Sequence, residues 1–211
     1  MTNNLANGAH IITSVDELTQ LYGTPFGPSI IKETNRISSS YRAFIEAAPF
    51  FTLASAGTDG LDCSPRGDDP GFVRVADETT LIIPDRRGNN RIDTLRNILH
   101  DPRVALLFLI PGCGETIRVN GRASISSDPA LTESFVMQGK APRTVIIVSV
   151  DRIYFQCAKA IVRSKLWDAS RHVDRQSLPS TGTILAELSE GKLSGAEYDR
   201  TAPERLKATL Y

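Results

Sequence analysis

The chain has 211 residues, which is enough for one large domain or two small ones with a buried core. Its content of 41% hydrophobic and 23% charged residues is typical of a soluble globular protein. Lys plus Arg equals Asp plus Glu at 24 each, so no overall field attracts the chain to nucleic acid. This balance argues against a general polyanion-binding surface and still permits a local anion site.

The sequence carries no signal for a membrane or for secretion. No apolar stretch approaches the roughly 20 residues that a membrane-spanning helix needs. Residues 1–10 lack the basic start and apolar block of a secretory signal. The three cysteines are odd in number and far apart, which favours a reduced protein over a disulfide framework. We therefore expect a cytoplasmic protein that makes no contact with a membrane.

Common metal and nucleotide signatures are missing. No CxxC pair occurs, and His10, His100 and His172 are scattered, so we expect no metal site. The GxSxG elbow, the GxxxxGK[ST] loop and the GxGxxG fingerprint are absent, and GCGETI at 112–117 lacks the third glycine. These absences argue against a hydrolase, a nucleotide triphosphatase and a dinucleotide-binding fold.

The first fifty residues are predicted to be mainly helical. Ser14–Glu17 has the capping-box pattern and leads into LTQLY. A second helix is predicted from about Ser38 to Ala47, and Pro49 ends it.

From residue 50 onward the chain is predicted to form mostly strands, because short apolar or alternating stretches are separated by turn residues. The predicted strand regions are a hairpin at 50–66, a hairpin at 72–84, and single strands at 103–112, 115–125 and 144–156. Six consecutive apolar residues at 104–109 predict a central strand that is covered on both faces. Helices are predicted at 90–100, 128–139 and 204–211.

This order of elements predicts a mainly β protein with peripheral helices (α+β), in which an antiparallel sheet closes into a barrel. The absence of βαβα alternation argues against a doubly wound fold. We expect an N-terminal helical extension at 1–48, a barrel domain at 49–168, and a C-terminal helical extension at 169–211 that packs on the same domain.

The turn after the strand at 81–84 carries three arginines, Arg86, Arg87 and Arg91. Gly88 breaks the chain there, and Asn89 or Asn90 is predicted to cap the following helix. A helix start presents free N–H groups and partial positive charge, so three added guanidiniums favour a phosphate. The alternative is a solvated surface cluster that Asp85 and Asp93 partly neutralise.

A second polar group follows the last predicted strand, in CAKAIVRSKLW at 157–167. If this segment is helical, Lys159 and Arg163 share one face. The alternative is a basic surface helix with a packed Trp167. The thiols of Cys157 and Cys63 could in principle take part in redox chemistry. We expect both to be buried packing residues and propose neither as a nucleophile.

In this order, FFTLASAGTDG, SPRG, LIIPDRRGNNR, HDPRVALLF and ETIRVNGRA resemble the pyridoxamine 5'-phosphate oxidase-like, FMN-binding split-barrel family over residues 40–168. The sequence is most similar to the branch with GETxRVNG and RSxLW signatures. The resemblance implies an antiparallel split β-barrel of the FMN-binding type, and a homodimer with FMN at its interface.

The resemblance also implies roles for individual residues in binding FMN. The flavin phosphate would contact Arg86, Asn90 and Arg91, with Arg87 beside them. The strand along the ribityl chain and ring would be Ser64, Pro65, Arg66 and Gly67. The backbone of Ile83 and Pro84 would touch the isoalloxazine, and Thr116 would face it from the partner subunit. Lys159, Arg163, Ser164 and Trp167 would cover the ring or bind the substrate.

The sequence thus predicts an FMN-dependent oxidoreductase that acts on a small molecule. The sequence contains no recognisable catalytic acid–base pair, and no residue in it indicates which substrate is used. The tail from Leu178 lacks the Trp, His and Arg pattern of pyridoxamine phosphate oxidases, which argues against oxidation of vitamin B6 phosphates. The alternatives are a non-catalytic flavin-binding protein for storage or sensing, an interaction domain that has lost its cofactor, and F420 or haem in place of FMN.

Overall fold

The computed structural model describes residues 11–211. The chain divides into a first unit that ends at Glu33 and a second unit, Thr34–Tyr211. The first unit contains α1 (Val15–Tyr22) and α2 (Gly27–Ile31), neither of which buries a residue. The side chain of Ser14 accepts a hydrogen bond from the backbone N–H of Glu17 at 3.1 Å, which confirms the predicted N-cap.

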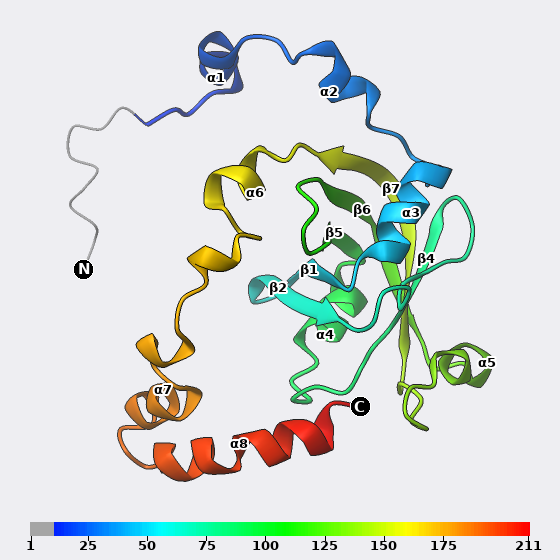
Figure 1. The fold of residues 1–211 in the computed structure, drawn as a ribbon. Coiled ribbons are helices and arrows are strands. Elements are labelled where there is room, and N and C mark those ends of the chain that lie inside the picture. The colour runs from blue at the N-terminus through cyan, green and yellow to red at the C-terminus, as the bar shows by residue number, and fades with distance from the viewer. Residues whose placement is uncertain (1–10) are drawn as a thin grey trace. The chain divides into compact units, whose positions relative to one another are not determined.

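The second unit is built on one seven-stranded antiparallel sheet (Figure 1). Its strands are β1 (Phe50–Gly57), β2 (Gly60–Gly67), β3 (Arg74–Val75), β4 (Thr80–Pro84), β5 (Arg103–Leu109), β6 (Thr116–Ser126) and β7 (Val145–Gln156). They are ordered β2-β1-β5-β6-β7-β4-β3. Both predicted hairpins and the antiparallel split-barrel architecture are confirmed.

The sheet is not closed. Within the described residues its end strands, β2 and β3, do not pair with each other, which corrects the expectation of full closure. The reason is that β3 has only two residues, both paired to β4, and offers no ladder to β2. One backbone edge of β2 is therefore not paired with another strand in the described residues.

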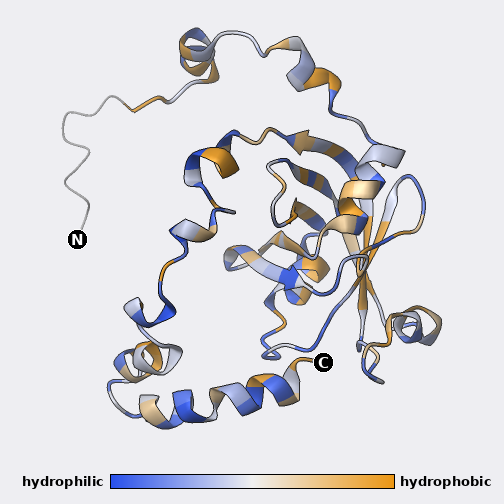
Figure 2. Ribbon diagram, viewed as in Figure 1, coloured by the Kyte–Doolittle hydropathy of each residue, from blue (hydrophilic) through white to orange (hydrophobic). Residues whose placement is uncertain are grey.

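The core follows the period-2 alternation of the strands. On β5, Val104, Leu106 and Phe108 are buried, and the Phe108 ring lies 4.9 Å from that of Phe51. The opposite face of β5 is only half-buried, so the strand is central in the sheet but is not covered on both sides within one chain. Figure 2 shows hydrophobic residues along the strands of the sheet and also on helices such as α2 and α6.

The remaining helices belong to the second unit. They are α3 (Ser39–Ala47), α4 (Asp93–His100), α5 (Pro129–Thr132) continued by η2 (Glu133–Phe135), α6 (Lys159–Ser164), η3 (Ala169–Arg171), η4 (Arg175–Ser177), α7 (Thr181–Leu188) and α8 (Gly195–Thr209). Of these, α3 and α4 contact strands of the sheet, and α7 and α8 contact each other. The predicted helix at 38–47 is confirmed, and the predicted tail helix is the end of α8. Among the described helices, none combines the length and the apolar character needed to cross a bilayer.

The last two helices form a close pair. The backbone N–H of Gly182, in the first turn of α7, donates to Asp199 of α8 at 2.8 Å. An added Cβ at Gly182 would lie 2.2 Å from the Gly195 carbonyl oxygen, so the close approach requires glycine at this crossing. After α8 the chain reaches Tyr211, whose hydroxyl donates to Asp68 beside the site described next.

Candidate functional site

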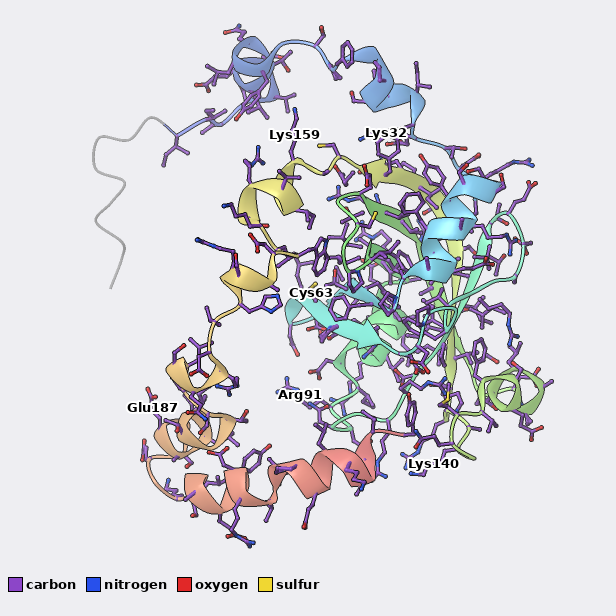
Figure 3. All side chains as sticks on the ribbon, viewed as in Figure 1. Lys32, Cys63, Arg91, Lys140, Lys159 and Glu187 are labelled. Carbon is purple, nitrogen blue, oxygen red and sulfur yellow. The ribbon has the colours of Figure 1, made fainter. Side chains whose placement is uncertain are left out.

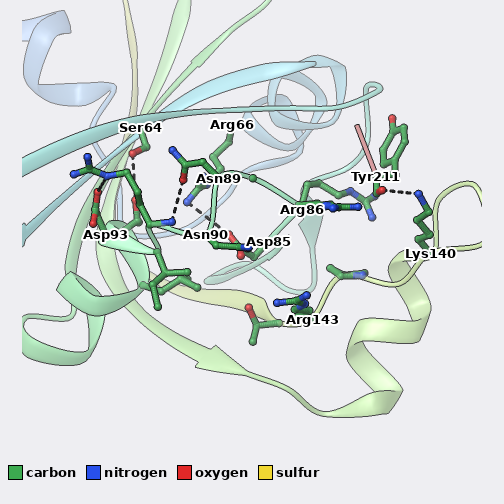
Figure 4. A pocket seen from close by; sticks show the side chains of 18 of the residues that line it. Ser64, Arg66, Asp85, Arg86, Asn89, Asn90, Asp93, Lys140, Arg143 and Tyr211 are labelled. Carbon is green, nitrogen blue, oxygen red and sulfur yellow. Dashed lines mark hydrogen bonds and ion pairs between the residues drawn. The ribbon is translucent and has the colours of Figure 1, made fainter. Parts of the chain in front are cut away.

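A pocket of about 920 Å³ lies beside the start of α4 (Figure 4). Its walls are the inner face of β2, the segment 85–95, the segment 140–144 and Tyr211. Two of these walls adjoin because β4 pairs with β7, with Pro84 opposite Val145. The backbone N–H of Asp85 then donates to the carbonyl of Thr144 at 3.0 Å, so the two flanking segments run side by side.

Strand β2 contributes every second side chain to the pocket. Asp62, Ser64 and Arg66 line it and are half-buried. Pro65 and Gly67 alternate with them on the exposed face. This polar face of β2 is open to the pocket and can contact a ligand there.

The turn before α4 has unusual backbone conformations. Asn90 and Ile92 have φ of 61° and 54°, and Ile92 occupies the N-cap position without a side-chain cap. The predicted asparagine cap is therefore wrong. The side chain of Asn89 instead accepts from the backbone N–H of Arg91 at 3.0 Å, which forms a local turn. A left-handed β-branched residue costs on the order of 1–3 kcal/mol, so the fold holds strain at this pocket.

The charged side chains of the pocket are unequally paired. Six are cationic and three are carboxylates, namely Arg66, Arg86, Arg87, Arg91, Lys140, Arg143, Asp62, Asp85 and Asp93. Arg91 pairs with Asp93 at 2.7 Å. Within residues 11–211, Arg87 and Arg143 have no ion-pair or hydrogen-bond partner. These two guanidiniums are therefore available to bind an anionic ligand.

Arg86, by contrast, already has several partners. Its Nε donates to Asp68 at 2.6 Å and its Nη1 to the carbonyl of Phe135 at 2.6 Å. The Tyr211 hydroxyl donates to the same Asp68 carboxylate at 2.8 Å, and Lys140 donates to the Tyr211 carbonyl at 2.7 Å. Burial opposes ionisation of Asp68, but the hydrogen bonds from Tyr211, a backbone N–H and Arg86 outweigh it and lower its pKa. Arg86 thus connects the turn to Asp68 and to the backbone at Phe135.

The lining of the pocket includes a weakly paired carboxylate and two polar atoms without hydrogen-bond partners in the described residues. Burial raises the pKa of Asp85, and the charge of Arg66, 3.6 Å away, offsets this only in part. Arg66 Nε and Thr144 Oγ1 are buried and have no hydrogen-bond partner within residues 11–211. Buried polar atoms normally have partners. These two atoms could gain one from a bound ligand.

Replacing Asp85 with Asn is expected to increase the affinity for sulfate about tenfold, because the carboxylate beside Arg66 repels an anion. Sulfate does not titrate in the relevant range, so isothermal titration calorimetry between about pH 4 and pH 7 isolates the protein groups. Since the pKa of Asp85 is raised, the wild-type affinity should rise as pH falls, and Asp85→Asn should flatten this dependence.

Protonation of Asp85 also changes the stability of the folded protein. Because the folded-state pKa of Asp85 is raised, its protonation favours the folded state, and this contribution disappears as pH rises through the folded value.

For the sulfate measurement, Asp59→Asn, in the exposed β1–β2 turn, makes the same charge change outside the pocket and serves as the control. Equal sulfate affinity in wild type and Asp85→Asn would contradict the assignment.

The pocket brings together part of the predicted cofactor site. The predicted residues that line it are Ser64, Arg66, Arg86, Arg87, Asn90 and Arg91. Ile83 and Pro84 are buried within β4 and are not part of its lining. Within one chain, the lining also does not include Pro65, Gly67, Thr116, Lys159, Arg163, Ser164 or Trp167. Figure 3 places Lys159 well away from Arg91 and Lys140.

The segment after β7 is helical, as the shared-face interpretation required. Trp167 follows α6, and its Nε1 donates to the carbonyl of Cys113 at 2.6 Å. An added Cβ at Gly114 would lie 2.7 Å from the Cβ of Ala158, so the loop before β6 packs tightly against the start of α6. Within one chain Trp167 is thus a packed residue whose N–H group is satisfied.

The expectation that Cys63 and Cys157 are buried is wrong, because both are exposed. Cys63 lies on the outward face of the edge strand β2, and Cys157 lies just beyond the end of β7.

Several lining residues were not predicted from the sequence. They are Asp62, Thr94, Lys140, Arg143, Thr144 and Tyr211. Asp62 could have been found, because it shares the period-2 face of Ser64 and Arg66. Thr94 lies in the first turn of α4, directly after the arginine turn. Lys140, Arg143 and Thr144 reach the pocket through the pairing of β4 with β7, and Tyr211 reaches it through the C-terminal segment. Neither of these two routes is visible as a local sequence pattern.

Comparisons with known proteins identify one matching family. Residues 37–157 match the family model described as pyridoxamine 5'-phosphate oxidase. No curated protein matches the chain. Among solved structures, HupZ of Group A Streptococcus is 20% identical, with 56% of this chain and 91% of that chain covered and a TM-score of 0.45.

Two further structures are similar at the same level. The general stress protein 26 of Bacillus anthracis str. Sterne is 18% identical, with 54% of this chain and 88% of that chain covered and a TM-score of 0.42. An F420 reductase is 19% identical, with 56% of this chain and 98% of that chain covered and a TM-score of 0.40. Since the family model spans more than half of the residues, this chain belongs to the pyridoxamine 5'-phosphate oxidase family.

Proposed function

We propose that this protein binds FMN in the pocket beside α4 and uses it as an oxidoreductase acting on a small molecule. The observation that carries the proposal is the pair of guanidiniums, Arg87 and Arg143, which line one pocket and have no anionic partner within residues 11–211. Membership of the pyridoxamine 5'-phosphate oxidase family supports the oxidoreductase class.

The donors of the pocket suit a phosphate monoester. Such a group carries a charge near −2 and binds best to charge-assisted donors, for which arginine is the usual source. Arg66 Nε and Thr144 Oγ1 could gain the hydrogen-bond partners that they lack. The volume of about 920 Å³ lies within the range of sites that hold cofactor-sized ligands. When bound, the flavin would supply hydride chemistry, and the chain would hold and orient it.

We also propose that the functional unit is a homodimer. Thr116 and the α6 segment with Trp167 lie outside the single-chain pocket, and a second subunit could bring these residues to the ring. The half-buried outer face of β5, which includes Leu107 and Leu109, is an apolar surface that such a subunit could cover. Analytical ultracentrifugation of the purified protein measures its mass in solution and so shows whether it is a dimer.

The test is to incubate the purified protein with excess FMN, remove free flavin by desalting, and record the absorption spectrum. We expect retained flavin at about one per chain, identified by mass after heat release. A protein that retains no FMN would contradict the proposal and leave the arginine turn as surface charge.

A second measurement separates turnover from storage or sensing. Under anaerobic conditions, NADH or NADPH should bleach the flavin absorption of an oxidoreductase that accepts these reductants. A tightly held flavin that neither reductant nor small-molecule substrates change would favour the non-catalytic alternative. Parallel binding measurements with F420 and haem test the other cofactors.

A further inference from the structure

Three residues at one end of the pocket form a hydrogen-bonded group, Asp62, Ser64 and Thr94. Asp62 Oδ2 accepts from the Ser64 hydroxyl at 3.0 Å and from the Thr94 hydroxyl at 3.2 Å. The Thr94 hydroxyl also lies 3.3 Å from Ser64 Oγ. Thr94 is only 3% exposed, so the group connects the inner face of β2 firmly to the first turn of α4.

The second carboxylate oxygen of Asp62 is available. Both hydrogen bonds go to Oδ2, and within residues 11–211 Oδ1 has no partner. Among the described residues no cation lies within ion-pair distance of Asp62, in contrast to Asp85 with Arg66 and Asp93 with Arg91, although the charge of Arg91 acts on Asp62 from further away. A half-buried carboxylate oxygen without a partner is a strong acceptor for a hydroxyl donor.

The same carboxylate repels a phosphate. Figure 4 shows Ser64 at one end of the pocket and Lys140 and Tyr211 at the other. Two like charges in contact are costly, so a phosphorylated ligand should place its phosphate toward Arg87 and Arg143. The part of the ligand next to Asp62 then needs hydroxyl groups rather than negative charge.

We propose that Asp62, held by Ser64 and Thr94, recognises hydroxyl groups of the ligand and selects a phosphorylated polyol. This inference rests on the proposed function, since the ribityl chain of FMN is such a polyol. F420 carries the same hydroxylated chain and would satisfy the group equally. Haem carries carboxylates and no hydroxyl groups, so Asp62 disfavours it.

The test compares two ligands, FMN and an FMN analogue whose N10 side chain is a phosphopentyl chain without hydroxyl groups. Dissociation constants are measured by quenching of flavin fluorescence for wild type and Asp62→Asn. We expect Asp62→Asn to weaken FMN about tenfold, because a charge-assisted hydrogen bond is lost. The same variant should leave the analogue unchanged or bind it slightly more tightly. F420 should follow FMN.

Thr94→Val tests the positioning of Asp62, and Asp59→Asn serves as the matched control. Thr94→Val removes one hydrogen bond that positions Asp62, so it should weaken FMN to a smaller degree and leave the analogue unchanged. Asp59→Asn makes the same charge change in the exposed β1–β2 turn and should not alter either affinity. Circular dichroism and melting curves show whether each variant is folded.

Two results would overturn the inference while leaving the proposed function intact. Tighter FMN binding by Asp62→Asn would mean that the phosphate lies beside Asp62. An equal loss for FMN and the analogue would mean that Asp62 acts only by holding β2 to α4. If wild type binds neither flavin, the proposed function fails, and the inference fails with it.

Discussion

Replacing Arg87 and Arg143 together with alanine should lower the affinity for FMN by about 100-fold or more. Each guanidinium lines the pocket, and neither has a partner within residues 11–211, so each can contribute a charge-assisted hydrogen bond to the phosphate. Such bonds are worth about 1.5–3 kcal/mol each, and losing two of them corresponds to this factor. The dissociation constant can be measured by fluorescence titration with FMN.

The stability of this double variant should change little, because both side chains are exposed and unbonded within the described chain. The matched control is Arg96→Ala with Arg171→Ala, which removes the same charge from exposed positions outside the pocket lining. FMN affinity should fall in the first pair only. An equal fall in both pairs would indicate a general electrostatic attraction, and no fall in either would place the phosphate elsewhere.

Replacing Arg86 with Met should lower the free energy of unfolding by about 3 kcal/mol or more. The Asp68 side chain is only 1% exposed and the Arg86 side chain 16%, so removing the cation leaves a buried carboxylate without its ion-pair partner. The hydrogen bond to the Phe135 carbonyl is lost as well. Urea denaturation measures the change.

The informative control for Arg86 is a second variant that also neutralises its partner. Arg86→Met combined with Asp68→Asn removes both charges and keeps an acceptor for the Tyr211 hydroxyl. This double variant should be clearly more stable than Arg86→Met alone, because no buried charge remains uncompensated. If the two variants are equally destabilised, the loss comes from packing and not from the ion pair.

These two predictions separate arginines that look alike in the sequence. The turn 86–91 identified a cationic site, but its local pattern could not show which guanidiniums are already paired. Arg91 pairs with Asp93, as the alternative surface-charge interpretation allowed. Arg86 instead pairs with Asp68, which lies 18 residues away, and Asp85 pairs with Arg66 of β2, a strand that does not pair with β4.

Local chemistry was sufficient for much of the fold. Side-chain caps depend on three or four consecutive residues, and the caps at Ser14, Ser38 and Asp128 form as their sequences indicate. Alternation of apolar and polar residues placed the hairpins and the half-buried strand β6 correctly. The asparagine cap before α4 failed because Asn89 uses its side chain within the preceding turn, and Ile92 takes the cap position instead.

By itself the sequence determined the class of fold, the family, and one basic edge of the pocket, because each depends on short-range spacing and on an ordered set of motifs. Tertiary structure decided the rest of the pocket. The pairing of β4 with β7 brings Arg143 and Thr144 beside the turn that begins at Asp85. The C-terminal segment brings Tyr211 to Asp68, 143 residues away. Contacts at such separations depend on strand order and helix packing, which no local pattern of residues encodes.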